Sequence, residues 1–102
     1  MNNSLPIRFT SKARREIKKI KKRNKPLYRK IKEELKNIMK DRYHGSPKVG
    51  DLSGIYSVDI RESSINYELA YQIRWDKDGE LILVILFSSR ENFYDELRRY
   101  LK

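Results

Sequence analysis

Residues 80–101, with the sequence ELILVILFSSRENFYDELRRYL, determine how the rest of this chain folds. Leu81 to Phe87 form an unbroken run of seven apolar residues that includes β-branched side chains. A run of this length indicates a strand that is buried on both of its faces. We therefore expect this strand to lie at the centre of a sheet.

A C-terminal helix is predicted directly after this strand. Ser88 and Glu91 have the S-x-x-E spacing of a capping box, in which Ser88 is the N-cap. The apolar residues that follow recur at helical spacing, at Phe93, Leu97, Tyr100 and Leu101. Arg90 and Tyr94 therefore lie where the strand ends and the helix begins, which makes them candidates for a functional site.

The composition limits the class of protein. A chain of 102 residues without repeats predicts a single domain, 1–102, with one modest core. No apolar run reaches the roughly 20 residues of a membrane helix, and no signal-peptide segment is present. The absence of cysteine excludes disulfides, and a single histidine, His44, argues against a multi-histidine metal site. We expect a cytoplasmic protein without a metal or a small-molecule cofactor.

The net charge is the strongest compositional signal. Lys and Arg number 24 against 14 Asp and Glu, which gives a formal net charge of +10. Such a chain favours a polyanionic partner, because basic side chains displace counterions from phosphates. An acidic protein partner explains the charge equally well, and the two are compatible. Segment 12–23 is especially basic, and its Lys18 and Lys22 are candidate phosphate contacts or simply solvated residues.

The rest of the chain supplies two helices and three strands. In order they are strand 6–10, helices 12–23 and 26–43, and strands 56–61 and 67–75, with a loop at 45–54. Thr10 or Ser11 caps the first helix, Pro26 starts the second, and Gly45 is expected to stop it in a left-handed conformation. The predicted fold is α+β, with the order β-α-α-β-β-β-α. It has a four-stranded, mostly antiparallel sheet, an N-terminal helical hairpin on one face and a C-terminal helix.

Alternation in the two middle strands divides their residues between two faces. Apolar residues such as Val58 and Leu69 are expected to face the helical hairpin. The opposite face then carries polar residues, namely Asp59, Arg61, Glu68, Gln72 and Arg74. Because the neighbouring strand 81–87 is apolar on both faces, something must cover part of this polar face. The C-terminal helix, a partner protein or both are the candidates.

This order and these residues resemble the RelE/ParE superfamily of bacterial toxin–antitoxin toxins. The resemblance covers nearly the whole chain and is strongest in residues 52–72, LSGIYSVDIRESSINYELAYQ. That segment is similar to the family's Gly-aromatic turn, Tyr-led strand, tight hairpin and Y-x-L-x-Y strand. The family typically has a basic or histidine residue at the end of the last strand and an aromatic residue shortly after it. Residues 88–94, SSRENFY, resemble this pattern, with Arg90 as the basic residue and Tyr94 as the aromatic one.

The resemblance implies one of two activities. Members of the RelE branch cleave mRNA in the decoding site of the ribosome without a metal, whereas members of the ParE branch inhibit DNA gyrase and cleave nothing. We favour the RelE-like reading, in which the chain is an mRNA interferase, that is, a ribosome-dependent endoribonuclease that inhibits translation. A gyrase inhibitor is the alternative, and a decayed toxin that only binds nucleic acid is a third possibility.

Site residues follow from the same resemblance. Arg61 and Arg90 match family positions that stabilise the phosphate, and Tyr94 matches the aromatic residue that stacks on a base or moves a proton. The catalytic reading requires Arg61 to face Arg90 across the sheet. RNA-binding roles are expected for Lys48 near the family's basic loop, and for Arg74, Lys18 and Lys22. The implied partners are a cognate antitoxin, the ribosome and mRNA.

For Glu68 and His44, the sequence leaves open both a catalytic and a purely structural role. Glu68 occupies a position where many family members have arginine, so it is a general base or, as we prefer, a salt-bridge partner of Arg61 or Arg74. His44 is a candidate for acid–base catalysis, because imidazole is the side chain best suited to proton transfer at physiological pH. Its place beside Gly45 favours an ordinary residue at a helix end.

Overall fold

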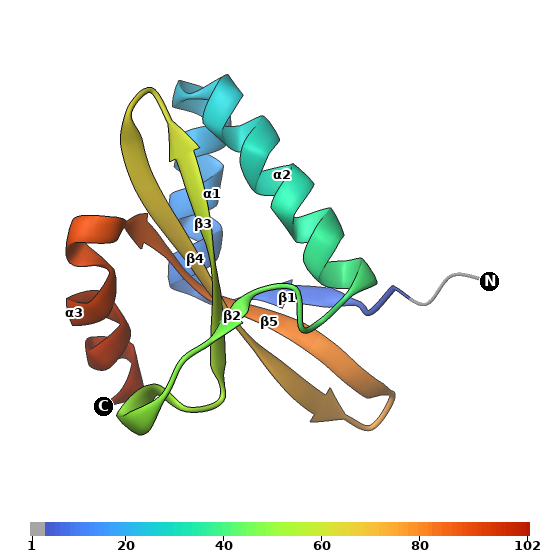
Figure 1. Ribbon diagram of the computed structural model, residues 1–102. Coiled ribbons are helices and arrows are strands. Elements are labelled where there is room, and N and C mark those ends of the chain that lie inside the picture. Colours follow the sequence, from blue (N-terminus) through green and yellow to red (C-terminus); the bar gives the residue numbers. More distant parts are fainter. Residues whose placement is uncertain (1–3) are drawn as a thin grey trace.

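A five-stranded sheet with helices on both faces forms the architecture of this protein (Figure 1). The computed structural model describes residues 4–102. The elements in chain order are β1 (Ile7–Phe9), α1 (Ser11–Arg23), α2 (Lys25–Lys40), β2 (Ser46–Pro47), the 3₁₀ turn η1 (Gly50–Leu52), β3 (Ile55–Glu62), β4 (Ile65–Asp76), β5 (Gly79–Ser89) and α3 (Arg90–Leu101). The predicted α+β class and the order of the main elements are confirmed.

The sheet has the strand order β1-β5-β4-β3-β2. Its edge strand β1 is parallel to β5, and all other neighbours are antiparallel. The strand predicted from the long apolar run is β5, which lies inside the sheet between β1 and β4. The prediction of four strands missed β2, where Ser46 and Pro47 pair with β3. Two residues are too few to produce a periodic pattern, so the sequence indicated only a loop there.

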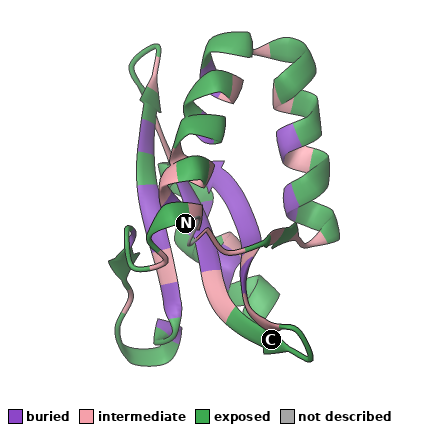
Figure 2. Cartoon of the chain, turned by 90° about the vertical axis from the view of Figure 1, so that its right-hand side faces the viewer, coloured by how far each residue is buried: buried purple, intermediate pink, exposed green. Residues whose placement is uncertain are grey.

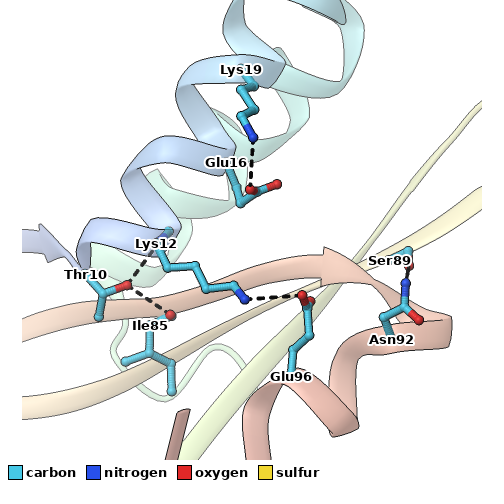
Figure 3. Close-up of polar contacts among 9 residues, drawn as sticks. Thr10, Lys12, Glu16, Lys19, Ile85, Ser89, Asn92 and Glu96 are labelled. Carbon is cyan, nitrogen blue, oxygen red and sulfur yellow. Dashed lines mark hydrogen bonds and ion pairs between the residues drawn. The ribbon is translucent and has the colours of Figure 1, made fainter. Parts of the chain in front are cut away.

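The start of α1 is fastened to the sheet by its cap. Thr10 is the N-cap, and its hydroxyl accepts a hydrogen bond from the N–H of Ala13 at 3.1 Å. The same hydroxyl donates to the carbonyl of Ile85 on β5 at 3.0 Å (Figure 3). Asn24 ends α1 and caps α2, because its side chain accepts from the N–H of Leu27 at 3.2 Å. These caps fix where the helical hairpin starts and turns.

The end of α2 differs from the prediction. The helix stops at Lys40 rather than near Tyr43, and Gly45 does not have a left-handed backbone. Gly45 is instead required by close packing: a Cβ there would lie 2.9 Å from the carbonyl oxygen of Ser57 and 2.9 Å from Cε1 of Tyr71. The Tyr71 hydroxyl accepts from the N–H of Gly45 at 2.9 Å and donates to the carbonyl of Arg42 at 2.7 Å. Burial raises the pKa of Tyr71 to about 12, so this hydroxyl keeps its proton at neutral pH.

Gly45→Ala is expected to destabilise the protein by roughly 1–3 kcal/mol, because the added methyl overpacks a site bounded by the Ser57 carbonyl and the buried Tyr71 ring. Equilibrium urea unfolding measures the loss. Ser46→Ala is the control, since Ser46 is exposed and surface changes stay within about 0.5 kcal/mol. Equal stability of the Gly45→Ala protein and the wild type would show that residues 41–45 shift at no cost.

The main core lies between the helical hairpin and the sheet. Ile17 of α1 and Ile31 of α2 pack against Leu69, Tyr71 and neighbouring residues of β3, β4 and β5. Figure 2 shows this layering, with buried strand segments and exposed outer faces of the helices. The face predicted for the hairpin is therefore correct.

A second cluster covers the opposite face of the sheet, where α3 packs. Phe93 and Leu97 of α3 are fully buried against Ile85, Leu86 and Ala70 of the sheet. The C-terminal helix thus covers the apolar far side of β5, as one of the sequence-based alternatives proposed. The buried apolar face of α3 is shorter than predicted, because Tyr100 and Leu101 at its end remain 38% and 42% exposed.

The predicted capping box does not form. Ser88 belongs to β5 and pairs with Glu68, so the N-cap is Ser89, and it makes no side-chain capping bond. The Ser89 hydroxyl instead accepts from Asn92 at 3.4 Å (Figure 3). Burial would raise the pKa of Glu96, but its hydrogen bonds with Ser88 and Lys12 outweigh burial and lower it. Strand pairing therefore keeps Ser88 out of the helix, and the Ser88 hydroxyl forms a hydrogen bond with Glu96 instead of capping α3.

The β3–β4 hairpin contains a strained turn. Glu62 pairs with Ile65, so Ser63 and Ser64 form a two-residue loop, and both have positive φ, 51° and 66°. Glycine and asparagine suit such turns far better than serine. Ser64→Gly is expected to stabilise the protein by up to about 1 kcal/mol in urea unfolding. Ser53→Gly is the control, since Ser53 has φ −54° and should gain nothing. A destabilised Ser64→Gly protein would contradict this account.

Candidate functional site

A polar cleft of about 260 Å³ opens where β2, β3 and β4 meet the start of α3. Its lining consists of Glu34, His44, Gly45, Ser46, Lys48, Ser57, Val58, Asp59, Glu68, Arg90 and Tyr94. Register explains part of this grouping, because Asp59 of β3 lies opposite Glu68 of β4, which lies opposite Ser88 near the start of α3. Four of the residues singled out in the sequence, Glu68, Lys48, Arg90 and Tyr94, are therefore brought together.

Glu68 lies deepest among the charged residues of the cleft. Only 3% of it is exposed, and its Oε2 accepts a hydrogen bond from the hydroxyl of Ser57 at 3.1 Å. A buried carboxylate needs such partners, because burial otherwise disfavours its charged form. The neighbouring strand supplies this partner, since Ser57 lies on the same face of the sheet.

Two cations from outside the sheet balance the Glu68 carboxylate. Lys48 Nζ lies 3.8 Å from Oε2, and Arg90 Nε lies 3.6 Å from Oε1. Both distances exceed good hydrogen-bonding range, so the contacts are ion pairs rather than fixed hydrogen bonds. Arg90 is 60% exposed, which leaves its guanidinium accessible to a ligand in the cleft. The predicted salt bridge of Glu68 is real, but its partners are Lys48 and Arg90 instead of Arg61 or Arg74.

Tyr94 forms the outer wall beside Lys48. Its hydroxyl accepts a hydrogen bond from Lys48 Nζ at 3.2 Å, and the ring contacts Lys48 and Arg98 as cation–π pairs, at 5.5 and 5.8 Å from the centroid. The ring is 39% exposed and meets Phe93 edge-on at 5.1 Å. Lys48 and Phe93 therefore hold the Tyr94 ring in place, and the exposed part of the ring is available for a base to stack on.

The remaining predicted residues lie outside this cleft. Arg61 donates from Nη1 to Asn66 at 3.3 Å and lines a neighbouring groove of about 300 Å³ with Lys30 and Glu33. It does not join Arg90 in one cluster, so the expected pairing of these two arginines is wrong. The catalytic hypothesis that required Arg61 to face Arg90 therefore fails, and any catalytic role must rest on the other residues of the Arg90 cleft. Arg74 bonds to Gln72 at 2.7 Å. The exposed Lys18 and Lys22 lie on α1, which packs against the sheet face opposite α3.

The structure adds two residues that the sequence did not place in the site. Glu34 of α2 reaches the cleft and lies 2.9 Å from Nε2 of His44. His44 is thus more than a residue at a helix end, because it lines the cleft and is held by a carboxylate. Helical periodicity marks Glu34 only as polar, and nothing local reveals that residues 41–45, which follow α2, bring His44 next to it.

Two limits on the chemistry come from the same part of the chain. Within residues 4–102, no group of three or more His, Asp or Glu side chains is arranged to hold a metal ion. None of the helices in this region is both long and apolar enough to span a membrane. What the cleft offers is a buried carboxylate, two cations, an imidazole and a phenol.

Solved structures share this fold. The chain resembles a YoeB/ParE toxin from Agrobacterium tumefaciens with a TM-score of 0.70 at 17% identity, over 84% of this chain and 99% of that one. A mutant of the E. coli toxin RelE in the free state gives 0.64 at 18%, over 94% and 97%. The YoeB dimer from Staphylococcus aureus gives 0.61 at 27%, over 83% and 95%. The fold is therefore that of the small RelE, YoeB and ParE toxins.

The family follows from the sequence itself. Residues 7–98 match the family described as the ParE-like toxin of type II bacterial toxin–antitoxin systems. The chain belongs to this family. Among curated proteins, no sequence matches it.

Proposed function

We propose that this toxin is a metal-independent endoribonuclease that cleaves mRNA on the ribosome. The observation that supports this most is the gathering of Glu68, Lys48, Arg90 and Tyr94 in one polar cleft. The net charge of +10 and the resemblance to the RelE branch support an RNA substrate.

RNA cleavage without a metal makes three demands. A base must take the proton of a 2′-hydroxyl, cations must stabilise the charge that develops on the phosphate, and the 5′-oxygen must receive a proton. Glu68 supplies the base, because its carboxylate lies next to both cations. Arg90 and Lys48 leave Glu68 to bind the phosphate, and Tyr94 stacks on a base. Arg61, in the adjacent groove, binds a flanking phosphate of the same strand.

Primer extension on mRNA that is translated by purified ribosomes tests this proposal. We expect the wild type to cut, and the double variant Arg90→Ala, Tyr94→Ala to lose at least about 10²-fold in rate. Lys77→Ala is the control, because Lys77 is an exposed lysine in the β4–β5 turn. Equal cutting by the double variant and the wild type would overturn the assignment of this cleft.

Inhibition of DNA gyrase is the second candidate, favoured by the ParE-like description of the family. In that case the cleft holds α3 in place and cleaves nothing. Supercoiling by purified gyrase distinguishes the two, since an endoribonuclease leaves it unaffected. A decayed toxin that only binds nucleic acid predicts no growth arrest when the chain is expressed alone.

An antitoxin partner is proposed for either activity. Two structures with this fold are toxin–antitoxin complexes, RelBE from E. coli and RelBE2 from Mycobacterium tuberculosis. An acidic amphipathic segment suits the charge of this chain, and it would lie along the sheet or displace α3. Co-expression with the product of a small acidic reading frame beside the gene should restore growth. Persistent growth arrest would exclude that product as the antitoxin.

A further inference from the structure

His44 lies at the rim of the polar cleft, on the side away from α3. It precedes β2, the edge strand next to β3, and 36% of its side chain is exposed. Its backbone N–H donates to the carbonyl of Asp41 at 3.0 Å, and its Nε2 lies 2.9 Å from Glu34 Oε1. Glu34 also accepts a hydrogen bond from Asn37 at 3.3 Å, which fixes the carboxylate. The imidazole is thus accessible but oriented.

The position of His44 relative to Glu68 matters for a phosphoryl transfer. His44 precedes β2 and is held by Glu34 of α2, the helix on the hairpin side of the sheet. Glu68 of β4 is held by Ser57 and by Arg90 of α3, the helix on the opposite side, and both residues line the same cleft. In-line attack places the entering 2′-oxygen and the leaving 5′-oxygen on opposite sides of phosphorus. An acid and a base at two sides of one cleft satisfy this requirement, whereas two groups on the same side do not.

We propose that His44 is the general acid of the cleavage reaction, and this inference rests on the proposed ribonuclease function. The 2′-oxygen attacks phosphorus as its proton passes to Glu68. The bond from phosphorus to the 5′-oxygen breaks, and that oxygen takes the Nδ1 proton of His44. The products are a 2′,3′-cyclic phosphate and a 5′-hydroxyl end. Glu34 stabilises the imidazolium before transfer, and water returns the two side chains to their starting protonation.

Tyr94 fits the role of acid less well. Its hydroxyl contacts Lys48 at 3.2 Å, and Lys48 contacts Glu68 at 3.8 Å, which places the phenol on the side of the base. The charged groups that share the cleft with His44 are Glu34 from α2, Lys48 after β2, Asp59 from β3, Glu68 from β4 and Arg90 from α3. Of these, only Glu34 contacts the imidazole.

An mRNA with sulfur in place of one bridging 5′-oxygen tests the role of His44 on programmed ribosomes. A thiolate leaves without a proton, so a variant that lacks only the general acid should regain its rate on this substrate. We expect His44→Ala to lose roughly 10²–10⁴-fold on normal mRNA and to cleave the sulfur-containing mRNA at close to the wild-type rate. Glu68→Gln should be slow on both, because its defect lies in deprotonation of the 2′-hydroxyl.

Other results would be equally decisive. An equal loss by His44→Ala on both substrates would overturn the acid role, as would a normal rate on unmodified mRNA. Thermal unfolding of His44→Ala checks that the fold is intact, and His44→Asn provides a second variant that cannot donate a proton in the same way. If the wild type cleaves neither mRNA, the ribonuclease function itself fails, and the assignment of His44 fails with it.

Discussion

Glu68→Gln is expected to lower the rate of mRNA cleavage by roughly 10²–10⁴-fold, the usual contribution of a general base. Glutamine has almost the shape of glutamate, and its amide oxygen still accepts the hydrogen bond from Ser57. It has no charge with which to take the 2′-hydroxyl proton. The stability of the fold should therefore change much less than the rate.

Binding of RNA is expected to respond in the opposite direction. In the free protein, Lys48 and Arg90 pair with Glu68 at 3.8 and 3.6 Å. Loss of the carboxylate charge frees both cations for the phosphate, so the affinity for RNA should hold or increase. A single-turnover rate, measured separately from the dissociation constant, shows this split between chemistry and binding.

Glu91→Gln is a matched control for this experiment. Glu91 is an exposed glutamate in the first turn of α3 and lies outside the cleft, so its substitution should leave both rate and binding unchanged. A purely structural Glu68 would predict something else. In that case rate and binding fall together, because Arg90 and Lys48 lose the group that positions them.

Much of the fold was predictable because it depends on local patterns. The apolar run of β5, the alternation in β3 and β4, and the cap at Thr10 each act over a few residues. The covering of β5 by α3 followed from a simple requirement, since an apolar strand face must be buried. Ser88 shows the limit of such reasoning: its capping motif was present, but pairing with Glu68 across the sheet kept it in the strand.

The candidate site was only half predictable, because its geometry depends on contacts distant in sequence. Family resemblance pointed to Arg90 and Tyr94 and weakly to Lys48. It could not show that Glu68 pairs with two of these cations, nor that Arg61 turns towards Asn66 at the hairpin. The link between Glu34 and His44 spans ten residues across the end of α2, where no periodic signal exists.

Phe93→Ala is expected to destabilise the protein by about 3–5 kcal/mol, the usual loss for a buried phenylalanine. Phe93 is fully buried at the centre of the cluster that joins α3 to the sheet. Its ring also supports the site, because it meets Tyr94 edge-on, and Lys48 Nζ lies 5.9 Å from its centroid. Equilibrium urea unfolding measures the free energy, and Tyr100→Ala on the same helix is a control with a half-exposed ring.

The way in which this stability is lost shows how α3 is coupled to the rest of the fold. If α3 unfolds only together with the sheet, Phe93→Ala should weaken amide protection in β4 and β5 as much as in α3. If α3 detaches on its own, hydrogen exchange should accelerate only within Arg90–Leu101, and the global unfolding transition should stay close to that of the wild type. The shared cluster with Ile85 and Leu86 favours the first outcome, because opening α3 exposes the interior strand β5 to water.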